Sequence, residues 1–494
     1  MARWKVGCVA LLAVLLTACA APPPPVPTAD GTSVAVARDD ASQERGDKLH
    51  PQVLARFGGA YDDARVARYV DGIGRRLIKV TPEAAEPWTF TVLDTPSVNA
   101  FAIPGGYVYV TRGLVALAED EAELAGVVAH EIAHVTARHG ARRQTRNRAA
   151  GAGILLGTLG LAVLGIEPPV VSDILQTALG GTLASYSRED EREADRIGIA
   201  YLAASGYDPE AQADFLEALT RNAKLDAEIA GQAYDPEATG FFATHPATAG
   251  RSREARETAR ATGVADGERG RDRHLAAIDG LAWGPSAAQG FVREGSFLHP
   301  VLDFAFDIPE GWAVSNRPEA VLLASRDRTR VIFDSARATA TDPRAYLTEV
   351  WAPTVASAVE TGSLQRVERL RIGGAPAARG LMPVQLGDDT FVAVLVAIRR
   401  DDRYFRFTGI VPRGAASAGI VVEVTESFRA LSPTERRAAT QRRIAVVRVA
   451  GGDTERSLAQ RMAVDESALD RFRVLNDLGP NTALQAGGRV KLIQ

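Results

Sequence analysis

Residues 130–134 read His-Glu-Ile-Ala-His, so two histidines stand four positions apart with a glutamate directly after the first. On a helix, such positions lie one turn apart on the same face. Both imidazoles can therefore reach one Zn²⁺ at about 2.0–2.1 Å, and the glutamate can take a proton from an attacking water. Seven histidines in 494 residues give only about 0.1 such pairs by chance, before the glutamate is required. We predict one Zn²⁺ per chain, bound by His130 and His134, with Glu131 as general base; a solvated helix face is the alternative.

A catalytic zinc needs a third protein ligand, and the best candidate lies in residues 187–195, which read Ser-Arg-Glu-Asp-Glu-Arg-Glu-Ala-Asp. Glu191 and Asp195 are four positions apart and share a helix face. On that face Glu191 can ligate zinc, while Asp195 can accept the outer ring N–H of a liganding histidine and fix its tautomer. Charge runs on helices are usually solvated, so we assign Glu189 and Glu193 to the solvent face.

Two helices must position these side chains. The first is predicted over residues 120–139, because Asp120 with Glu123 resembles a capping box and apolar residues then recur at helical spacing. The second carries Glu191, and its apolar pattern continues as far as Leu202. The candidate ligands therefore belong to two amphipathic helices that must face each other.

Four separated motifs resemble metallopeptidase family forty-eight, which includes the CAAX prenyl proteases and the HtpX-type heat-shock proteases. They are the two motifs above, the strand–turn–strand pattern of residues 99–110, and Thr-His-Pro at residues 244–246. The resemblance covers about residues 41–262 and implies a mainly α (α+β) gluzincin-type zinc metallopeptidase domain, to which we assign residues 41–265. It also implies that Glu191 is the third zinc ligand and that Asp195 supports the ligand set.

The same resemblance gives roles to residues outside the two helices. Asn99, Ala100 and Phe101 begin a predicted edge strand beside the cleft, where an extended substrate peptide can pair through main-chain hydrogen bonds. His245 either stabilises the oxyanion or caps the zinc as a fourth ligand in a resting state, and a surface histidine is the alternative. Arg251 pairs with Glu191, with Asp195 or only with solvent.

The first residues resemble the export signal of a bacterial lipoprotein. Residues 6–18 are apolar, too short a run to cross a bilayer as a helix, and follow the positive Arg3 and Lys5. Leu16-Thr17-Ala18-Cys19 resembles a lipobox, so we predict a signal peptide over residues 1–18, lipidation of Cys19 and a Pro-rich tether over residues 19–40. Ala20 favours the outer membrane by the family rule; an ordinary signal peptide cleaved at the alanines is the alternative.

The stretch between the two ligand helices is unusual. Arginines are frequent from residue 138 to 148, and residues 151–165 are rich in Gly, Ala and Leu. Fifteen residues are short for a membrane span. We interpret the 151–181 segment as a buried helical hairpin or a mobile lid over the cleft, with contact to a membrane surface as a third possibility.

Two further domains are predicted after the peptidase domain. Residues 285–435 alternate between strand-like and helical segments, which indicates an α+β module with an antiparallel sheet and a partner-binding, substrate-presenting or purely structural role. Residues 442–494 resemble a small βααβ LysM domain, with Gly452-Asp453-Thr454, Leu475-Asn476 and a final basic strand. By resemblance, this domain binds peptidoglycan.

Composition limits the remaining classes of function. The chain is 46% hydrophobic and 24% charged, which excludes disorder throughout, and its net charge of −4 argues against a nucleic-acid binder. We predict a secreted, lipid-anchored zinc endopeptidase of the bacterial periplasm that hydrolyses misfolded or unassembled envelope proteins. The alternatives are a zinc-dependent peptidoglycan peptidase and a non-catalytic envelope scaffold or chaperone.

Overall fold

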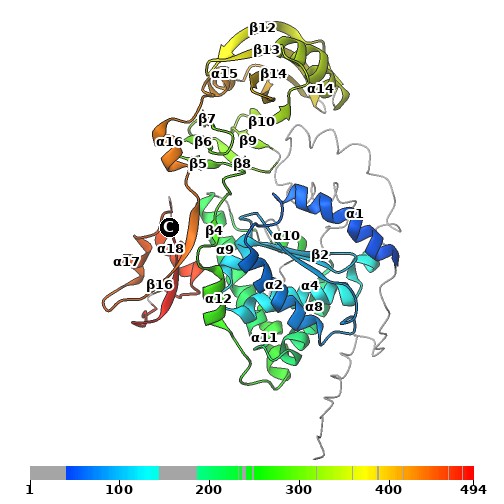
Figure 1. Cartoon of the computed structure of the whole chain (residues 1–494), viewed down its shortest axis with the longest axis vertical. Coiled ribbons are helices and arrows are strands. Elements are labelled where there is room, and N and C mark those ends of the chain that lie inside the picture. Colours follow the sequence, from blue (N-terminus) through cyan, green and yellow to red (C-terminus); the bar gives the residue numbers. More distant parts are fainter. Residues whose placement is uncertain are drawn as a thin grey trace, which may run out of the picture.

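The computed structural model describes residues 40–143, 186–231, 233–235, 241–246, 250–318, 320–358, 360–386, 389–415, 417–464, 467–480 and 482–494. The predictions for the signal peptide, for Cys19, for almost all of the tether and for the 151–181 segment lie outside those residues. Within the described ranges, no helix has the length and apolarity that a bilayer crossing requires. Figure 1 shows a helical body, an α+β module at one end of it, and the C-terminal elements beside the body.

A small sheet forms one side of the helical body. Strands β1 (Thr89–Leu93), β2 (Ala100–Ile103) and β3 (Tyr107–Thr111) lie in the order β1-β3-β2, so β2 is an edge strand, as predicted. The β2–β3 turn contains Gly105 and Gly106, both with positive φ, which side-chain-bearing residues rarely adopt. Helix α1 (Asp40–Arg56) packs on one face of β2, and α4 (Glu121–Thr136) packs on the other.

Helix α4 lies at the centre of the body. It packs against α2 (Ala64–Ile78), α8 (Arg188–Ala204) and α9 (Ala211–Ile229), while α11 (Arg251–Ala261) packs on α8 and α9. Gly198 of α8 permits this close packing, because a Cβ there would lie 3.1 Å from the backbone nitrogen of His130. A residue without a side chain therefore brings the two ligand helices together.

The start of α4 agrees with the predicted capping box only in part. Asp120 accepts a hydrogen bond from the Glu123 backbone N–H at 2.9 Å, as expected. The Glu123 carboxylate reaches one residue further back, however, and accepts from the N–H of Glu119 at 2.7 Å. The helix also ends at Thr136, earlier than predicted, because Arg138 has a φ of 56° and turns the chain.

The α+β module contains two antiparallel sheets. The smaller one joins β5 (Phe291–Arg293), β6 (Ser296–His299) and β7 (Phe304–Asp307). The larger one follows the order β11-β13-β14-β15-β10-β9-β8, with β12 also pairing with β13. Its strands are β8 (Ala313–Asn316), β9 (Val321–Ala324), β10 (Arg330–Arg337), β11 (Glu360–Thr361), β12 (Gln365–Ile372), β13 (Ala375–Leu386), β14 (Asp389–Arg400) and β15 (Arg403–Pro412).

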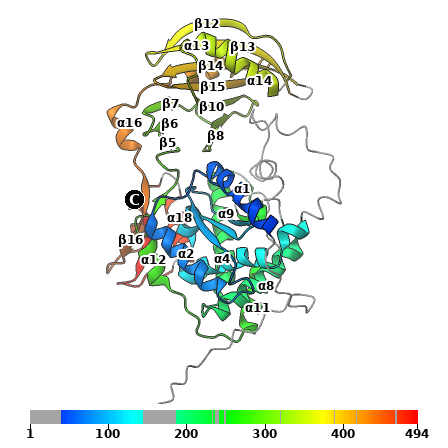
Figure 2. The ribbon, with the colours of Figure 1, turned by 45° about the vertical axis from the view of Figure 1, so that its right-hand side comes forward.

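Helices cover both faces of the larger sheet. One face packs under α13 (Pro343–Ala345), the π-helix η1 (Tyr346–Trp351) and α14 (Ala352–Ala358). The other face packs against α15 (Ala418–Glu426) and the small sheet. Figures 1 and 2 show that the chain then returns through α16 (Pro433–Ala438) to the side of the helical body.

The C-terminal elements follow the predicted order of strand, helix, helix and strand. They are β16 (Arg442–Arg448), α17 (Glu455–Ala459), α18 (Ala468–Leu475) and β17 (Arg489–Ile493). They do not form a separate core, however. Strand β16 pairs with both β17 and β4 (Ala282–Trp283), and the apolar residues of this βααβ unit belong to the same buried cluster as α2, α4 and α9. The C-terminal unit is therefore packed into the core of the helical body.

Lys491 of β17 makes the most buried contact of this interface. Its side chain has no exposed surface, and Nζ donates to the carbonyl oxygens of Ala116, Leu117 and Ala118 at 3.2, 3.2 and 2.7 Å. These carbonyls close α3 (Arg112–Leu117), and Nζ also lies 3.2 Å from the carboxylate of Glu119. His274 of α12 (Arg271–Ile278) donates to the same Ala118 carbonyl, and burial lowers the pKa of this histidine to about 3. A buried cation thus fixes the loop that leads into α4.

Candidate metal centre

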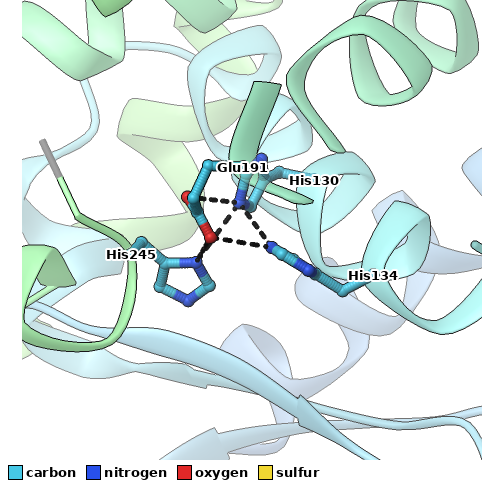
Figure 3. Close-up of side chains that lie close together, drawn as sticks. All are labelled: His130, His134, Glu191 and His245. Atoms are coloured by element: carbon cyan, nitrogen blue, oxygen red, sulfur yellow. Dashed lines mark hydrogen bonds and ion pairs between the residues drawn. The ribbon is translucent and has the colours of Figure 1, made fainter. Parts of the chain in front are cut away.

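Four side chains from three parts of the body converge on one point (Figure 3). His130 and His134 come from successive turns of α4, Glu191 comes from the first turn of α8, and His245 follows α10 (Phe241–Thr244). The Nε2 atoms of the two α4 histidines are 3.0 Å apart, and Glu191 Oε1 lies 3.3 Å from His134 Nε2. His245 Nδ1 lies 3.0 Å from the same carboxylate oxygen. The structure therefore brings together the three predicted ligands and His245.

The chemistry of this cluster fits a zinc ion. The Nδ1 atom of His130 faces a carboxylate, which requires a proton there and leaves the lone pair of Nε2 directed at the cluster. Imidazole nitrogens and a carboxylate oxygen are the donors that Zn²⁺ takes in proteins. Both oxygens of the Glu131 carboxylate are buried beside this point and accept no hydrogen bond in the described structure, and Oε1 lies 3.3 Å from Nε2 of His245. The donor set fits a zinc site, and a buried carboxylate lies directly beside it.

Burial and charge set the protonation of the cluster. The charges of His245 and Arg251 outweigh burial and hold the pKa of Glu191 well below its usual range. Burial lowers the pKa of His134, whereas the carboxylates of Asp195 and Glu191 outweigh burial at His130 and raise its pKa to about 9. Zinc binding displaces a proton from such a nitrogen. Burial raises the pKa of Glu131, which makes its carboxylate a stronger proton acceptor near neutral pH.

Asp195 and Arg251 both contact the predicted ligands. Asp195 Oδ1 is 2.9 Å from His130 Nδ1, so the carboxylate orients the first ligand. Arg251 contacts both predicted acids: its Nε lies 2.6 Å from Asp195 Oδ2, and its Nη1 lies 2.8 Å from Glu191 Oε2. Gln212 of α9, which the sequence analysis missed, donates to Asp195 at 3.1 Å.

The assignment of Glu193 to the solvent face was wrong, whereas Glu189 is exposed as predicted. Glu193 is only 8% exposed, because residues 139–143 turn back after Arg138 and pack against it. Its carboxylate accepts from Arg142 at 2.7 Å and contacts His139 at 3.2 Å. Burial raises the pKa of Glu193, but these hydrogen bonds outweigh it and lower the pKa overall.

Aromatic rings cover the cluster. Tyr186 stacks on His134 with ring centroids 3.8 Å apart and an interplanar angle of 19°. Phe241 stacks on His245 at 4.3 Å and 15°. None of the four ligand candidates is more than 2% exposed, so the centre is closed in this structure. The sequence analysis missed both rings, although Tyr186 directly precedes the second motif and Phe241 lies four residues before His245.

The predicted substrate-binding residues lie at the edge of the small sheet. Asn99 precedes β2, and its side chain accepts from the backbone N–H of Ala100 at 2.8 Å. The ring of Phe101 faces α1 and packs with Val53 and Tyr109, away from α4. A contribution of Phe101 to substrate binding would therefore come from its backbone.

Residues 64–259 match peptidase family M48. The beta-barrel assembly-enhancing protease of Escherichia coli (strain K12) is 31% identical over 243 residues, which are 48% of this chain and 47% of that protein. The protein of the same name from Yersinia pestis is 32% identical over 243 residues, with the same coverage. Mitochondrial metalloendopeptidase OMA1 of Schizosaccharomyces pombe is 32% identical over 189 residues, covering 38% of this chain and 52% of that protein. The chain spans about half the length of the curated relatives it matches.

Proposed function

Because residues 64–259 belong to peptidase family M48, we propose that this protein is a zinc-dependent endopeptidase that hydrolyses misfolded or unassembled proteins of the bacterial cell envelope. The observation that carries the proposal is the convergence of His130, His134 and Glu191 beside the buried carboxylate of Glu131. A purely structural zinc site does not require this carboxylate, whose burial costs free energy although it contacts His245 at 3.3 Å.

The mechanism assigns one task to each residue. When bound by His130, His134 and Glu191, zinc supplies a Lewis acid that brings the pKa of water towards about 7 and polarises a peptide carbonyl. Glu131 takes the proton from the attacking water and then delivers it to the nitrogen of the leaving amine. Asp195 and Arg251 hold the ligand side chains in place while the carboxylate of Glu131 gains and loses the proton.

The substrate proposal rests on the edge strand. Strands β2 and β3 are antiparallel, and Ala100 and Ala102 of β2 stand opposite Val110 and Val108 of β3. The other side of β2 has no partner in the described sheet. An extended backbone could add there, which favours unfolded chains of many sequences. Two relatives are named beta-barrel assembly-enhancing proteases, which supports substrates in the assembly of envelope proteins. A signal peptide and a lipidated Cys19 would locate the enzyme on the periplasmic side of the outer membrane.

Peptidoglycan remains a proposed partner through the C-terminal βααβ unit. The turn between β16 and α17 is solvent-exposed at residues 450–452, as is the approach to β17 at residues 485–488. Both loops are therefore accessible for a glycan although the unit is packed into the body. The alternative of a peptidoglycan peptidase requires cleavage of muropeptides in preference to unfolded protein.

His245 is best explained as a fourth ligand in a resting state. Its Nδ1 faces the cluster at 3.0 Å from Glu191 and 3.3 Å from His130, and a fourth protein ligand closes a zinc site. If the closed form holds about 90% of the molecules, His245→Ala should raise the initial rate of cleavage about tenfold at saturating zinc. A role in oxyanion stabilisation predicts the opposite, a loss of about 10²–10³-fold. His50→Ala on α1 controls for loss of an imidazole.

Metal removal tests the function itself. Dialysis against a chelator should reduce cleavage of a reduced, unfolded protein by at least about 10²-fold, because the Lewis acid contributes several kcal/mol. One equivalent of zinc per chain should restore the rate, and the same protein in its folded form should resist cleavage. Soluble muropeptides serve as the competing substrate. Preferential cleavage of muropeptides would favour a peptidoglycan peptidase over a protease of unfolded proteins. Full activity of the metal-free protein would exclude the zinc mechanism.

A further inference from the structure

Each of the two α4 histidines has a hydrogen-bond partner at Nδ1, behind the ring and away from the cluster, but the two partners differ. Behind His130, the carboxylate of Asp195 is directly paired with Arg251. Behind His134, one more side chain intervenes: His134 Nδ1 lies 2.8 Å from His139 Nδ1, and His139 Nε2 lies 3.2 Å from Glu193 Oε2. Arg142 then donates to the same oxygen at 2.7 Å. Each path leads from a ligand ring to a carboxylate–arginine pair.

Hydrogen-bond chemistry allows only one arrangement of protons along the second path. Because His134 presents Nε2 to the cluster, its ring proton must be on Nδ1, which donates to His139. His139 must then accept at Nδ1 and carry its own proton on Nε2, where it donates to Glu193. Glu193 remains a carboxylate because Arg142 pairs with it. The geometry selects the tautomer that ligates zinc.

A second metal ion is the competing explanation, since His139, Asp190 and Glu193 also lie close together and are buried. The acids of this group already have partners, however. Asp190 accepts from the hydroxyl of Ser187 at 2.7 Å in the capping box of α8. The guanidinium of Arg142 lies 2.7 Å from Glu193 and 4.0 Å from Asp190, where it already supplies a positive charge. The arrangement therefore favours a hydrogen-bonded path over a metal site.

We propose that His139, Glu193 and Arg142 form a positioning relay that fixes the ring of His134 and strengthens its bond to zinc. The proposal rests on the zinc site of the proposed function, but it does not depend on the substrate. His139 has no exposed surface, whereas the side chain of Arg142 is 46% exposed, so the relay connects the buried ligand to the protein surface. These three are positioning residues, since none of them contacts the reacting atoms.

Zinc affinity of the metal-free full chain, measured by competition with a chromophoric chelator, tests the relay. His139→Leu removes the acceptor and should weaken zinc binding about 10–100-fold, the usual cost of losing such a partner. His139→Asn retains an acceptor oxygen near the position of Nδ1 and should recover most of the affinity. Glu193→Gln should weaken binding about tenfold. The matched control is Glu189→Gln, the same change at an exposed position one turn earlier on α8, which should leave affinity unchanged.

The outcomes separate this proposal from the proposed function. Wild-type zinc affinity in both His139→Leu and Glu193→Gln would overturn the relay. If Glu189→Gln weakens zinc binding as much as Glu193→Gln does, the effect comes from the loss of a charge and the relay is also overturned. Two zinc ions per wild-type chain, falling to one in Glu193→Gln, would establish a second metal site instead. If the wild-type chain binds one zinc but cleaves nothing, the proposed function fails while the relay is still measured. If His139→Leu does not fold, Glu193→Gln decides the question.

Discussion

Replacing Glu131 with glutamine is expected to reduce cleavage of an unfolded protein by about 10²–10⁴-fold while zinc remains bound. Glutamine has nearly the same shape but cannot accept the proton of the attacking water. The proposed ligands are His130, His134 and Glu191, so the substitution leaves these donors intact. Glu131 accepts no hydrogen bond among the described residues, and glutamine keeps a side-chain oxygen for the 3.3 Å contact with His245, so the replacement should not destabilise the fold. The measurement is the initial rate, with zinc content determined on the same samples.

Glu257→Gln is the matched control, since that carboxylate lies on α11 with 69% of its side-chain surface exposed. It should retain the wild-type rate. Equal cleavage by wild type and Glu131→Gln, with zinc in both, would mean that another group is the general base. Failure of both to bind zinc would instead favour the scaffold or chaperone alternative.

The second large effect is expected on stability. Lys491→Met should lower the free energy of unfolding of the full chain by about 1–3 kcal/mol, the cost of leaving buried acceptors without a donor. The substitution removes the donor of the Ala116 and Leu117 carbonyls, whereas Ala118 keeps His274 and Glu119 keeps Arg271. Chemical denaturation followed by circular dichroism measures the change.

Lys48→Met provides the control, because that lysine has 71% of its side-chain surface exposed on α1. It should change stability by less than about 0.5 kcal/mol. If Lys491→Met costs no more than Lys48→Met, the interface between β17 and α3 contributes little.

The convergence of the proposed ligands could be predicted in part because their spacing is local. His130 and His134 lie on one helix, and Glu191 and Asp195 lie on another, so the period of the helix places each pair on one face. The packing of the two helices against each other followed from the resemblance to a family and not from periodicity. Gly198, which permits the close approach, carries no recognisable local signal.

The relay could not be predicted for the opposite reason. His139 lies five positions after His134, and a continuous helix would direct the two rings to different faces. The left-handed conformation of Arg138 ends the helix and returns the chain, which brings His139 onto His134 and buries Glu193. Because Arg138 has a positive φ, Glu193 is buried against His139 and is not exposed to solvent.

Strand prediction failed where tertiary packing overrides local preference. In the α+β module the sequence pattern predicts strands near residues 304–308, 321–324, 330–333, 367–372, 391–399 and 404–411, but it predicts none at β13, which lies inside the larger sheet. Its sequence contains Pro376, Gly380 and Pro383, which local rules place outside sheets. Pairing with β12 and β14 holds it in place. The βααβ order predicted for residues 442–494 is present, but β16 also pairs with β4, which no local pattern could indicate.

The packing of β16 and β17 into the helical body also fixes an order of events in time. A chain that emerges from its N-terminal end exposes all four metal ligands roughly two hundred residues before Arg442 appears. Until β17 arrives, the loop ahead of α4 lacks the cation that holds it. In a partly synthesised chain, the proposed site residues would therefore be present before the contacts that hold the loop ahead of α4. In this way the late-arriving strands would complete the frame around the proposed ligands only after most of the chain has been synthesised.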